Sequence, residues 1–125
     1  MDILIVEDDP VDMKLLSAVL KANDHRVLEK ASAEQAFEAI KARHPEVILL
    51  DLQLPGMDGL ALARLLKQTP ATCHIPIIAM TAAQEKFSRE EALQAGCDAY
   101  IVKPVDTRSL SEQITRAAAS PGKPA

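Results

Sequence analysis

Several short apolar runs of this sequence are followed directly by residues that could take part in phosphoryl chemistry. Acids follow two runs, a hydroxyl follows another and an ammonium follows the last: Glu7, Asp8 and Asp9, then Asp51, then Thr81 and Ala82, then Lys103 and Pro104. Crowded carboxylates repel one another unless a cation neutralises them, and Mg2+ prefers such oxygen ligands. A carboxylate can also attack phosphorus and form an acyl phosphate, whose oxygens need positive and hydrogen-bonding partners. The residue types therefore predict Mg2+-assisted phosphoryl transfer to a carboxylate.

The elements that must position these residues alternate along the chain. Short apolar runs predict strands at residues 3–6, 26–29, 47–50, 75–80 and 99–102. Amphipathic stretches predict helices at residues 10–22, from Ser32 to Pro45, around residues 60–66, from Ser88 to Gly96, and from Asp106 or Thr107 to residue 119. Ser32 with Gln35, and Ser88 with Glu91, match the capping box that opens a helix. The chain thus contains five predicted strand–helix units.

The order of these units predicts an α/β protein with a doubly wound parallel sheet. The continuous apolar run at residues 47–50 is typical of a strand that is covered on both faces. Repeated strand–helix units build a five-stranded parallel sheet with helices on both faces. Because the carboxyl ends of parallel strands meet at one edge, the acids, the hydroxyl and the lysine are expected to lie there together.

Composition excludes several other classes of protein. The 125 residues suffice for one domain, and 14 basic against 18 acidic residues give a net charge of −4. An acidic chain with a single tyrosine, two phenylalanines and no tryptophan is poorly suited to nucleic acid. No apolar run approaches the roughly 20 residues that span a bilayer, and no signal peptide is apparent, so we expect a cytoplasmic protein without a membrane segment. Cys73 and Cys97 are expected to be ordinary thiols.

Other polar residues near the predicted site are assigned structural roles. Asp9 is expected to be a solvated neighbour of the acidic pair, and Asp58 is expected to cap a helix. The three histidines do not group near the predicted site, which excludes a phosphohistidine or zinc role for His25, His44 and His74.

Four segments, in this order, resemble the response regulator receiver domain of two-component signalling. They are ILIVED at residues 3–8, LDLQLPGMDG at 50–59, IPIIAMTA at 75–82 and GCDAYIVKP at 96–104. The resemblance implies a flavodoxin-like (βα)5 fold with strand order 2-1-3-4-5. It also implies a receiver domain over residues 1–119, followed by a flexible C-terminal tail at residues 120–125.

The resemblance assigns the acceptor and the metal site. Asp51 matches the aspartate that accepts the phosphoryl group. Asp8 matches a direct ligand of Mg2+, and Glu7 matches a ligand that binds through water. Asp51 and the backbone carbonyl of Gln53 complete the protein ligands, and Mn2+ is expected to substitute for Mg2+.

The resemblance also assigns residues that bind the phosphoryl group and report its presence. Lys103, Thr81 and Ala82 are expected to contact that group, and Tyr100 is expected to move inward when Thr81 engages it. The family usually has a cis peptide bond where Lys103 precedes Pro104, and an X-Pro bond carries only a small cis penalty.

The implied function is a phosphorylation-dependent switch rather than an enzyme. A sensor histidine kinase or a histidine phosphotransfer protein would phosphorylate Asp51. The surface of residues 87–95, 99–102 and 107–119 would then change its affinity for a downstream protein. Slow self-dephosphorylation would be tuned by Gln53 and Ala83. The amino-acid sequences of the motifs are similar to those of stand-alone cell-cycle receivers and of receivers in hybrid kinases. We expect a monomer or a weak dimer.

Alternatives remain open at this point. An Mg2+-dependent phosphatase with an aspartyl nucleophile would commonly carry an acid where Gln53 stands. A flavin-binding module would not place Glu7, Asp8 and Asp9 beside the flavin phosphate, because the charges repel. A degenerate receiver that only binds proteins would not need the intact site. The chain could also be the receiver of a larger hybrid kinase or regulator.

Overall fold

Five parallel strands within residues 1–119, the part of the chain that the computed structural model describes, form one sheet in the order β2-β1-β3-β4-β5. The strands are β1 (Asp2–Val6), β2 (Arg26–Lys30), β3 (Val47–Asp51), β4 (Ile77–Thr81) and β5 (Ala99–Val102). The predicted doubly wound α/β fold and strand order are confirmed. The predicted tail, residues 120–125, lies outside the described residues.

Burial follows the position of each strand in the sheet. Every residue of β3 and β4 is buried, as their continuous apolar sequences predict for strands covered on both faces. Strand β2 lies at an edge of the sheet and is largely exposed, with charged residues such as Arg26 and Glu29 on it. Charges at an edge discourage pairing with another chain.

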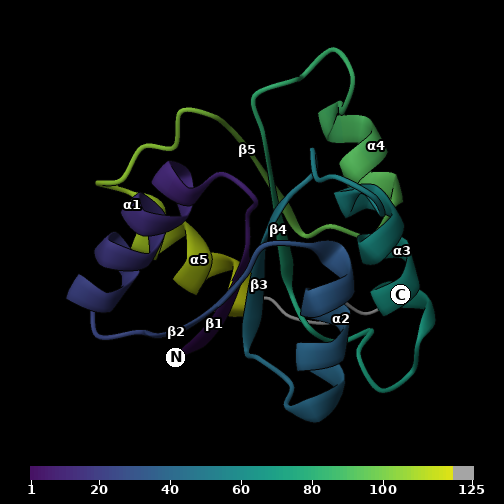
Figure 1. Ribbon diagram of the computed structural model, residues 1–125, viewed down its shortest axis with the longest axis horizontal. Helices are drawn as coiled ribbons and strands as arrows, with labels where there is room; N and C mark the ends of the chain where they lie inside the picture. The colour runs from purple at the N-terminus through teal and green to yellow at the C-terminus, as the bar shows by residue number, and fades with distance from the viewer. Residues whose placement is uncertain (120–125) are drawn as a thin grey trace.

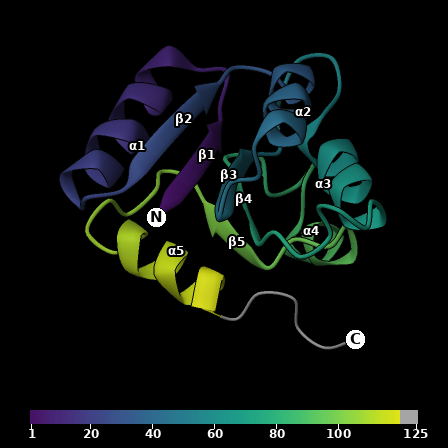
Figure 2. The same ribbon diagram turned by 90° about the horizontal axis from the view of Figure 1, so that it is seen from below.

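Helices cover both faces of the sheet, as Figures 1 and 2 show. Helices α1 and α5 lie on one face, and α2, α3 and α4 lie on the other. The core is accordingly divided by the sheet into two hydrophobic clusters, one with side chains from α1 and α5 and one with side chains from the other three helices. The helices are α1 (Pro10–Ala22), α2 (Ala33–Ala42), α3 (Gly59–Gln68), α4 (Arg89–Gln94) and α5 (Leu110–Ala119).

Side-chain caps begin most of these helices. Asp58 accepts a hydrogen bond from the Ala61 N–H at 2.8 Å, which confirms its predicted role at the start of α3. Ser88 and Glu91 form the predicted capping box of α4. Asp9, expected only as a solvated neighbour, also caps α1 by accepting from the Val11 N–H at 3.1 Å. The cap fixes the chain between β1 and α1, where the acidic residues lie.

The predicted starts of β4 and α5 were wrong. Strand β4 begins at Ile77 rather than at residue 75, because Pro76 has no N–H and the Ile75 N–H bonds to the Thr72 carbonyl at 3.0 Å instead. Helix α5 begins at Leu110, after a turn in which the Asp106 carboxylate accepts from the Arg108 N–H at 3.0 Å. Asp106 therefore stabilises a turn before the helix instead of capping the helix itself.

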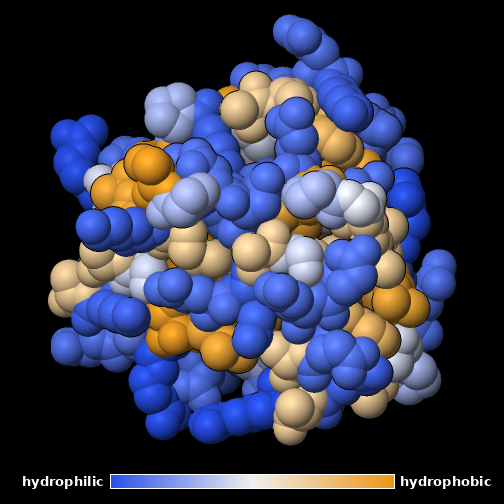
Figure 3. Space-filling view, in the orientation of Figure 1, coloured by the Kyte–Doolittle hydropathy of each residue, from blue (hydrophilic) through white to orange (hydrophobic). Residues whose placement is uncertain are grey.

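The surface is mostly polar, and hydrophobic atoms occur in separate small patches on the face drawn in Figure 3. Large exposed apolar side chains come from several elements: Val11, Leu15, Leu28, Leu93 and Val102. Within residues 1–119, every helix is too short or too polar to cross a bilayer.

Candidate functional site

The residues predicted to act together come from the carboxyl ends of β1, β3, β4 and β5. Asp51 and Thr81 are the last residues of β3 and β4, while Glu7 and Lys103 directly follow β1 and β5. The parallel register places these ends side by side, since Asp51 pairs with Met80 and Thr81 with Val102. One edge of the sheet therefore carries the whole predicted set.

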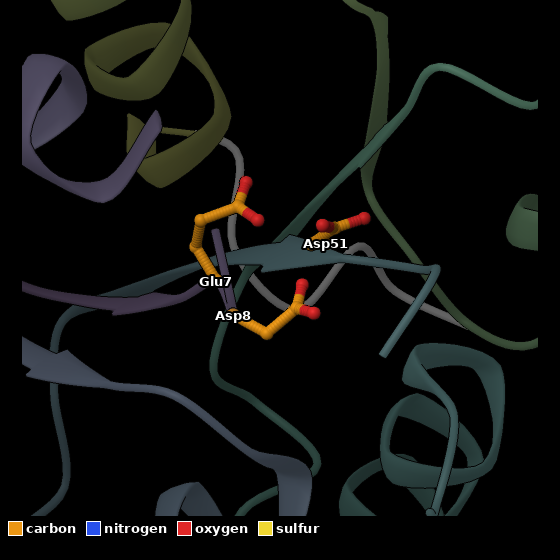
Figure 4. A group of neighbouring side chains, drawn as sticks. All are labelled: Glu7, Asp8 and Asp51. Atoms are coloured by element: carbon orange, nitrogen blue, oxygen red, sulfur yellow. The ribbon is translucent and has the colours of Figure 1, made fainter. Parts of the chain in front are cut away.

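Carboxylates converge at this edge (Figure 4). Glu7 and Asp8, which follow β1, face Asp51 at the end of β3, and one oxygen of each lies within 4.8 Å of the others. Glu7 and Asp51 are buried, whereas Asp8 is exposed. Mg2+ binds carboxylate oxygens and retains several waters. This cluster fits Mg2+ because it supplies such oxygens and because its exposed side leaves room for water.

Lys103 supplies the positive charge that this cluster needs. Its ammonium lies 2.5 Å from Glu7 Oε1, 3.2 Å from Asp51 Oδ2 and 3.2 Å from Asp12 Oδ2. Burial alone would lower the pKa of Lys103. The hydrogen bond to Glu7 and the negative charges of Asp51 and Glu7 outweigh burial and raise that pKa. Lys103 is thus held as a cation beside Asp51.

Glu7 has the most perturbed carboxyl group of the site. Burial, together with the neighbouring Asp51, raises its pKa from 4.5 to about 7, although the hydrogen bond from Lys103 opposes this shift. Without an added cation, Glu7 therefore holds a proton up to near-neutral pH. A bound divalent ion would favour its charged form.

Thr81 and Tyr100 form the inner side of the site. Thr81 is fully buried, and its hydroxyl oxygen accepts a hydrogen bond from the Ala83 N–H at 2.9 Å. Tyr100 is also buried, and its hydroxyl donates to the Phe87 carbonyl at 2.5 Å. The Arg89 guanidinium lies 5.2 Å from the centre of the Tyr100 ring. In this structure, the Tyr100 ring already occupies an inward position.

The remaining predicted residues line the rim. The Gln53 N–H donates to Asp51 Oδ1 at 2.9 Å, so the backbone after β3 orients the carboxylate, while the Gln53 side chain is exposed. Ala82 is exposed and Ala83 half-buried, both directly after β4. The peptide bond between Lys103 and Pro104 is cis.

A close approach at Gly59 fixes the end of β3. A Cβ at this position would lie 2.5 Å from the Asp51 carbonyl oxygen and 2.6 Å from the Leu52 Cα. The Gly59 N–H donates to the Leu52 carbonyl at 3.1 Å. Only glycine lets the first turn of α3 pack this closely on the backbone that carries Asp51.

Asp12 is a residue of the site that the sequence analysis missed. The histidines, in contrast, were predicted to lie away from the site. Asp12 lies in the first turn of α1, a few residues after the predicted acidic run, and this nearness in the sequence was the available signal. His25 instead contacts the Met1 amino group and Ser111, remote from the carboxylates in the sequence and in its contacts.

Comparison with known proteins agrees with this geometry. The family model described as the response regulator receiver domain matches residues 3–115. The polar-differentiation response regulator DivK of Brucella ovis is 37% identical over 112 residues, which cover 90% of this chain and 91% of the relative.

Solved structures show the same fold. The receiver domain of the sensor histidine kinase PA1611 of Pseudomonas aeruginosa, which has a magnesium ion coordinated in its active-site cleft, is 34% identical, with a TM-score of 0.86 over 94% of this chain and 97% of its own. The BeF3-activated receiver domain of RstA from Klebsiella pneumoniae is 30% identical, with a TM-score of 0.84 over 93% and 97% of the two chains. Phosphorylation on an aspartate in two-component signalling is the general function of this family. By its sequence match, its fold and its cluster of carboxylates around a lysine, this chain belongs to the response regulator receiver family.

Proposed function

We propose that Asp51 is the phosphoryl acceptor of this receiver. The observation that carries the proposal is the position of its carboxylate, which is buried at the end of β3, 3.2 Å from the Lys103 ammonium and beside Glu7 and Asp8. A carboxylate that is oriented by the Gln53 N–H and faces a fixed cation is placed to attack phosphorus.

Glu7, Asp8 and Asp51, together with the backbone carbonyl of Gln53, are the residues that would hold Mg2+. The magnesium ion in the related PA1611 domain supports this assignment. When bound, the ion would neutralise charge on the carboxylates and on the incoming phosphoryl oxygens. Mn2+, which accepts the same oxygen ligands, would substitute for it.

The chain's own residues have distinct roles in the transfer. One Asp51 oxygen forms a bond to phosphorus as the bond to the donor nitrogen of a phosphohistidine breaks, and the imidazole leaves with that electron pair. The Lys103 ammonium donates to a phosphoryl oxygen, and the Thr81 hydroxyl donates to another. Ala82, next to Thr81, offers its backbone N–H to the same group.

Thr81 would pass the signal on. To reach the phosphoryl group, its hydroxyl gives up the Ala83 N–H, which moves the backbone between β4 and α4. Tyr100, which is hydrogen-bonded to Phe87 in that same segment, responds to the movement. The surface formed by α4, β5 and α5 then changes its affinity for a protein target, as a shift between two packed states.

The partners follow from the same chemistry. The donor is a sensor histidine kinase or a histidine phosphotransfer protein, and the output is a protein contact rather than nucleic acid. We infer a receiver domain over residues 1–119 and a cytoplasmic monomer or weak dimer. Self-dephosphorylation is slow and is tuned by Gln53 and Ala83, whose exposed or half-buried positions flank the acceptor.

Intact-mass measurement after incubation with acetyl phosphate and Mg2+ tests the proposal. We expect one added phosphoryl group in the wild-type chain and none in Asp51→Asn or after chelation of the metal. Asp58→Asn is the matched control, because it makes the same chemical change at a helix cap and should still be phosphorylated. Equal labelling of Asp51→Asn would refute the assignment. Sustained release of phosphate from a generic ester would instead favour the phosphatase alternative, for which Gln53 offers no general acid.

A further inference from the structure

The Lys103 ammonium has no free N–H for an incoming phosphoryl group. An ammonium carries three N–H donors, and in the described part of the chain Lys103 donates to Glu7, Asp12 and Asp51. Phosphorylation of Asp51 therefore requires Lys103 to give up at least one existing contact. Which carboxylate it leaves decides the cost of reaching the phosphorylated state.

The contact with Asp12 is the one that can be released most easily. The Glu7 side chain is fully buried, so losing its partner would leave a carboxyl group without compensation, and Asp51 is the residue that is modified. The Asp12 side chain is 39% exposed, so water can replace Lys103 there. An ion pair with one such exposed partner is weak. Lys103 is thus free to turn from Asp12 toward the phosphoryl group.

The surroundings leave space for this movement. A cavity of about 280 Å³ adjoins the site and is bordered by Asp12, Lys103, Leu15 and Pro104. Neither charged side chain is enclosed on that side. The Asp12 carboxylate can therefore move away from Lys103 without displacing the core.

The charge of Asp12 also opposes the product. A phosphoryl group brings up to two negative charges to Asp51, and the Asp12 carboxylate shares the same ammonium at 3.2 Å. Because both carboxylates lie 3.2 Å from the same nitrogen, Asp12 and Asp51 are close enough for their like charges to disfavour each other. Asp12 therefore both competes for the cation and repels the group that the cation must bind.

We propose that Asp12 is a positioning residue that holds Lys103 in the unphosphorylated state and lowers the affinity of the site for the phosphoryl group. The inference rests on the proposed function, and it goes beyond it by assigning a role to a residue outside the acceptor, metal and switch set. Asp12 acts by holding Lys103 and by the repulsion of its charge, and it donates no hydrogen bond to the phosphoryl group.

Binding of beryllofluoride at saturating Mg2+ tests the role of Asp12. This phosphoryl analogue is the activating group in the related RstA domain. Asp12→Asn keeps the shape and a hydrogen-bond acceptor but removes the charge, and we expect it to bind beryllofluoride about twofold to fivefold more tightly at low salt. The gain should shrink as salt is added, because its origin is electrostatic. A residue that only anchors α1 would give no such salt-dependent gain.

Glu112→Gln is the matched control, because Glu112 also lies in the first turn of a helix and forms an exposed ion pair, with Arg116. It removes the same charge from a side chain that pairs with Arg116 rather than with Lys103, and it should leave the affinity unchanged. If Asp12→Asn binds no more tightly than wild type, or if Glu112→Gln gives the same gain, the inference is wrong while the proposed function stands. If the wild-type chain does not bind beryllofluoride, or if Asp51→Asn binds it equally well, the proposed function fails and the inference fails with it.

Discussion

The Lys103 ammonium lies 2.5 Å from Glu7 Oε1 and bridges it to Asp51, so one side chain after β5 binds two buried carboxyl groups, one after β1 and one at the end of β3. These residues are 96 and 52 positions from Lys103 in the sequence. The contact therefore ties three strands together at the edge that carries the site, and it makes the stability of that edge depend on charge.

Replacing Lys103 with methionine should destabilise the protein strongly. The change leaves buried Glu7 and Asp51 without their cation, and removal of one partner from a buried ion pair costs about 3 kcal/mol or more. Urea unfolding in the absence of metal measures the loss, and added Mg2+ should recover part of it. The control is Lys41→Met, which removes an exposed pair with Glu38 and should cost less than about 1 kcal/mol. A small loss in Lys103→Met would mean that Lys103 does not stabilise the buried carboxyl groups of Glu7 and Asp51.

The contribution of Glu7 to the stability of the metal-free protein should fall as the pH rises from 4.5 to about 7. The pKa of Glu7 is about 7 in the folded state and 4.5 as its ordinary value, so between these values the folded state binds more protons than the unfolded state. The stabilising contribution of Glu7 is therefore fully present below pH 4.5, and it is lost as the pH rises through about 7. Urea unfolding in chelator at several pH values measures this slope.

Glu7→Gln supplies the control for the pH effect. Glutamine has no ionisable group, so this part of the slope should disappear in the variant. Saturating Mg2+ should also reduce the slope in the wild type, because the metal favours the charged carboxylate. An unchanged slope in Glu7→Gln would assign the pH dependence to another group.

Thr81→Ala should remain competent for phosphorylation but lose the coupling to Tyr100. The substitution removes the oxygen that accepts from the Ala83 N–H, which costs about 1 kcal/mol of stability, but it leaves Asp51 and Lys103 in place. Tyr100 is the only tyrosine in the chain, so its ring signals in NMR spectra are a direct probe. Beryllofluoride with Mg2+ should shift these signals in the wild type and not in Thr81→Ala. The same shift in both proteins would show that Thr81 does not relay the change.

Gly59→Ala should destabilise the fold more than Gly56→Ala does. At Gly59 the new Cβ meets the backbone of Asp51 and Leu52 at 2.5 and 2.6 Å, and forced overpacking against backbone costs about 3 kcal/mol. At Gly56, φ is +72° and the Cβ meets only the exposed Glu34 carboxylate, so the cost is about 1 kcal/mol of backbone strain. Thermal unfolding compares the two variants. Equal losses would mean that the start of α3 can shift without cost.

Local patterns were sufficient for much of the fold. Apolar runs predicted the strands because a short run of apolar and β-branched residues favours a strand within its own segment, and Ser88 with Glu91 predicted a capping box because both partners lie within one helical turn. The boundaries of β4 and α5 were less well predicted. There, hydrogen bonds of Ile75 and Asp106 within adjacent turns competed with continuation of the strand or the helix.

The sequence by itself determined which residues gather at one edge of the sheet, because parallel strands present their carboxyl ends together and each motif directly follows a strand. Only the tertiary structure decided how those side chains share charge. The contact of Lys103 with Asp12, 91 residues away, and the burial that raises the pKa of Glu7 depend on how the start of α1 and the segment after β5 meet at the carboxyl edge of the sheet. Such contacts arise from register and packing between distant segments, which no local pattern of residues specifies.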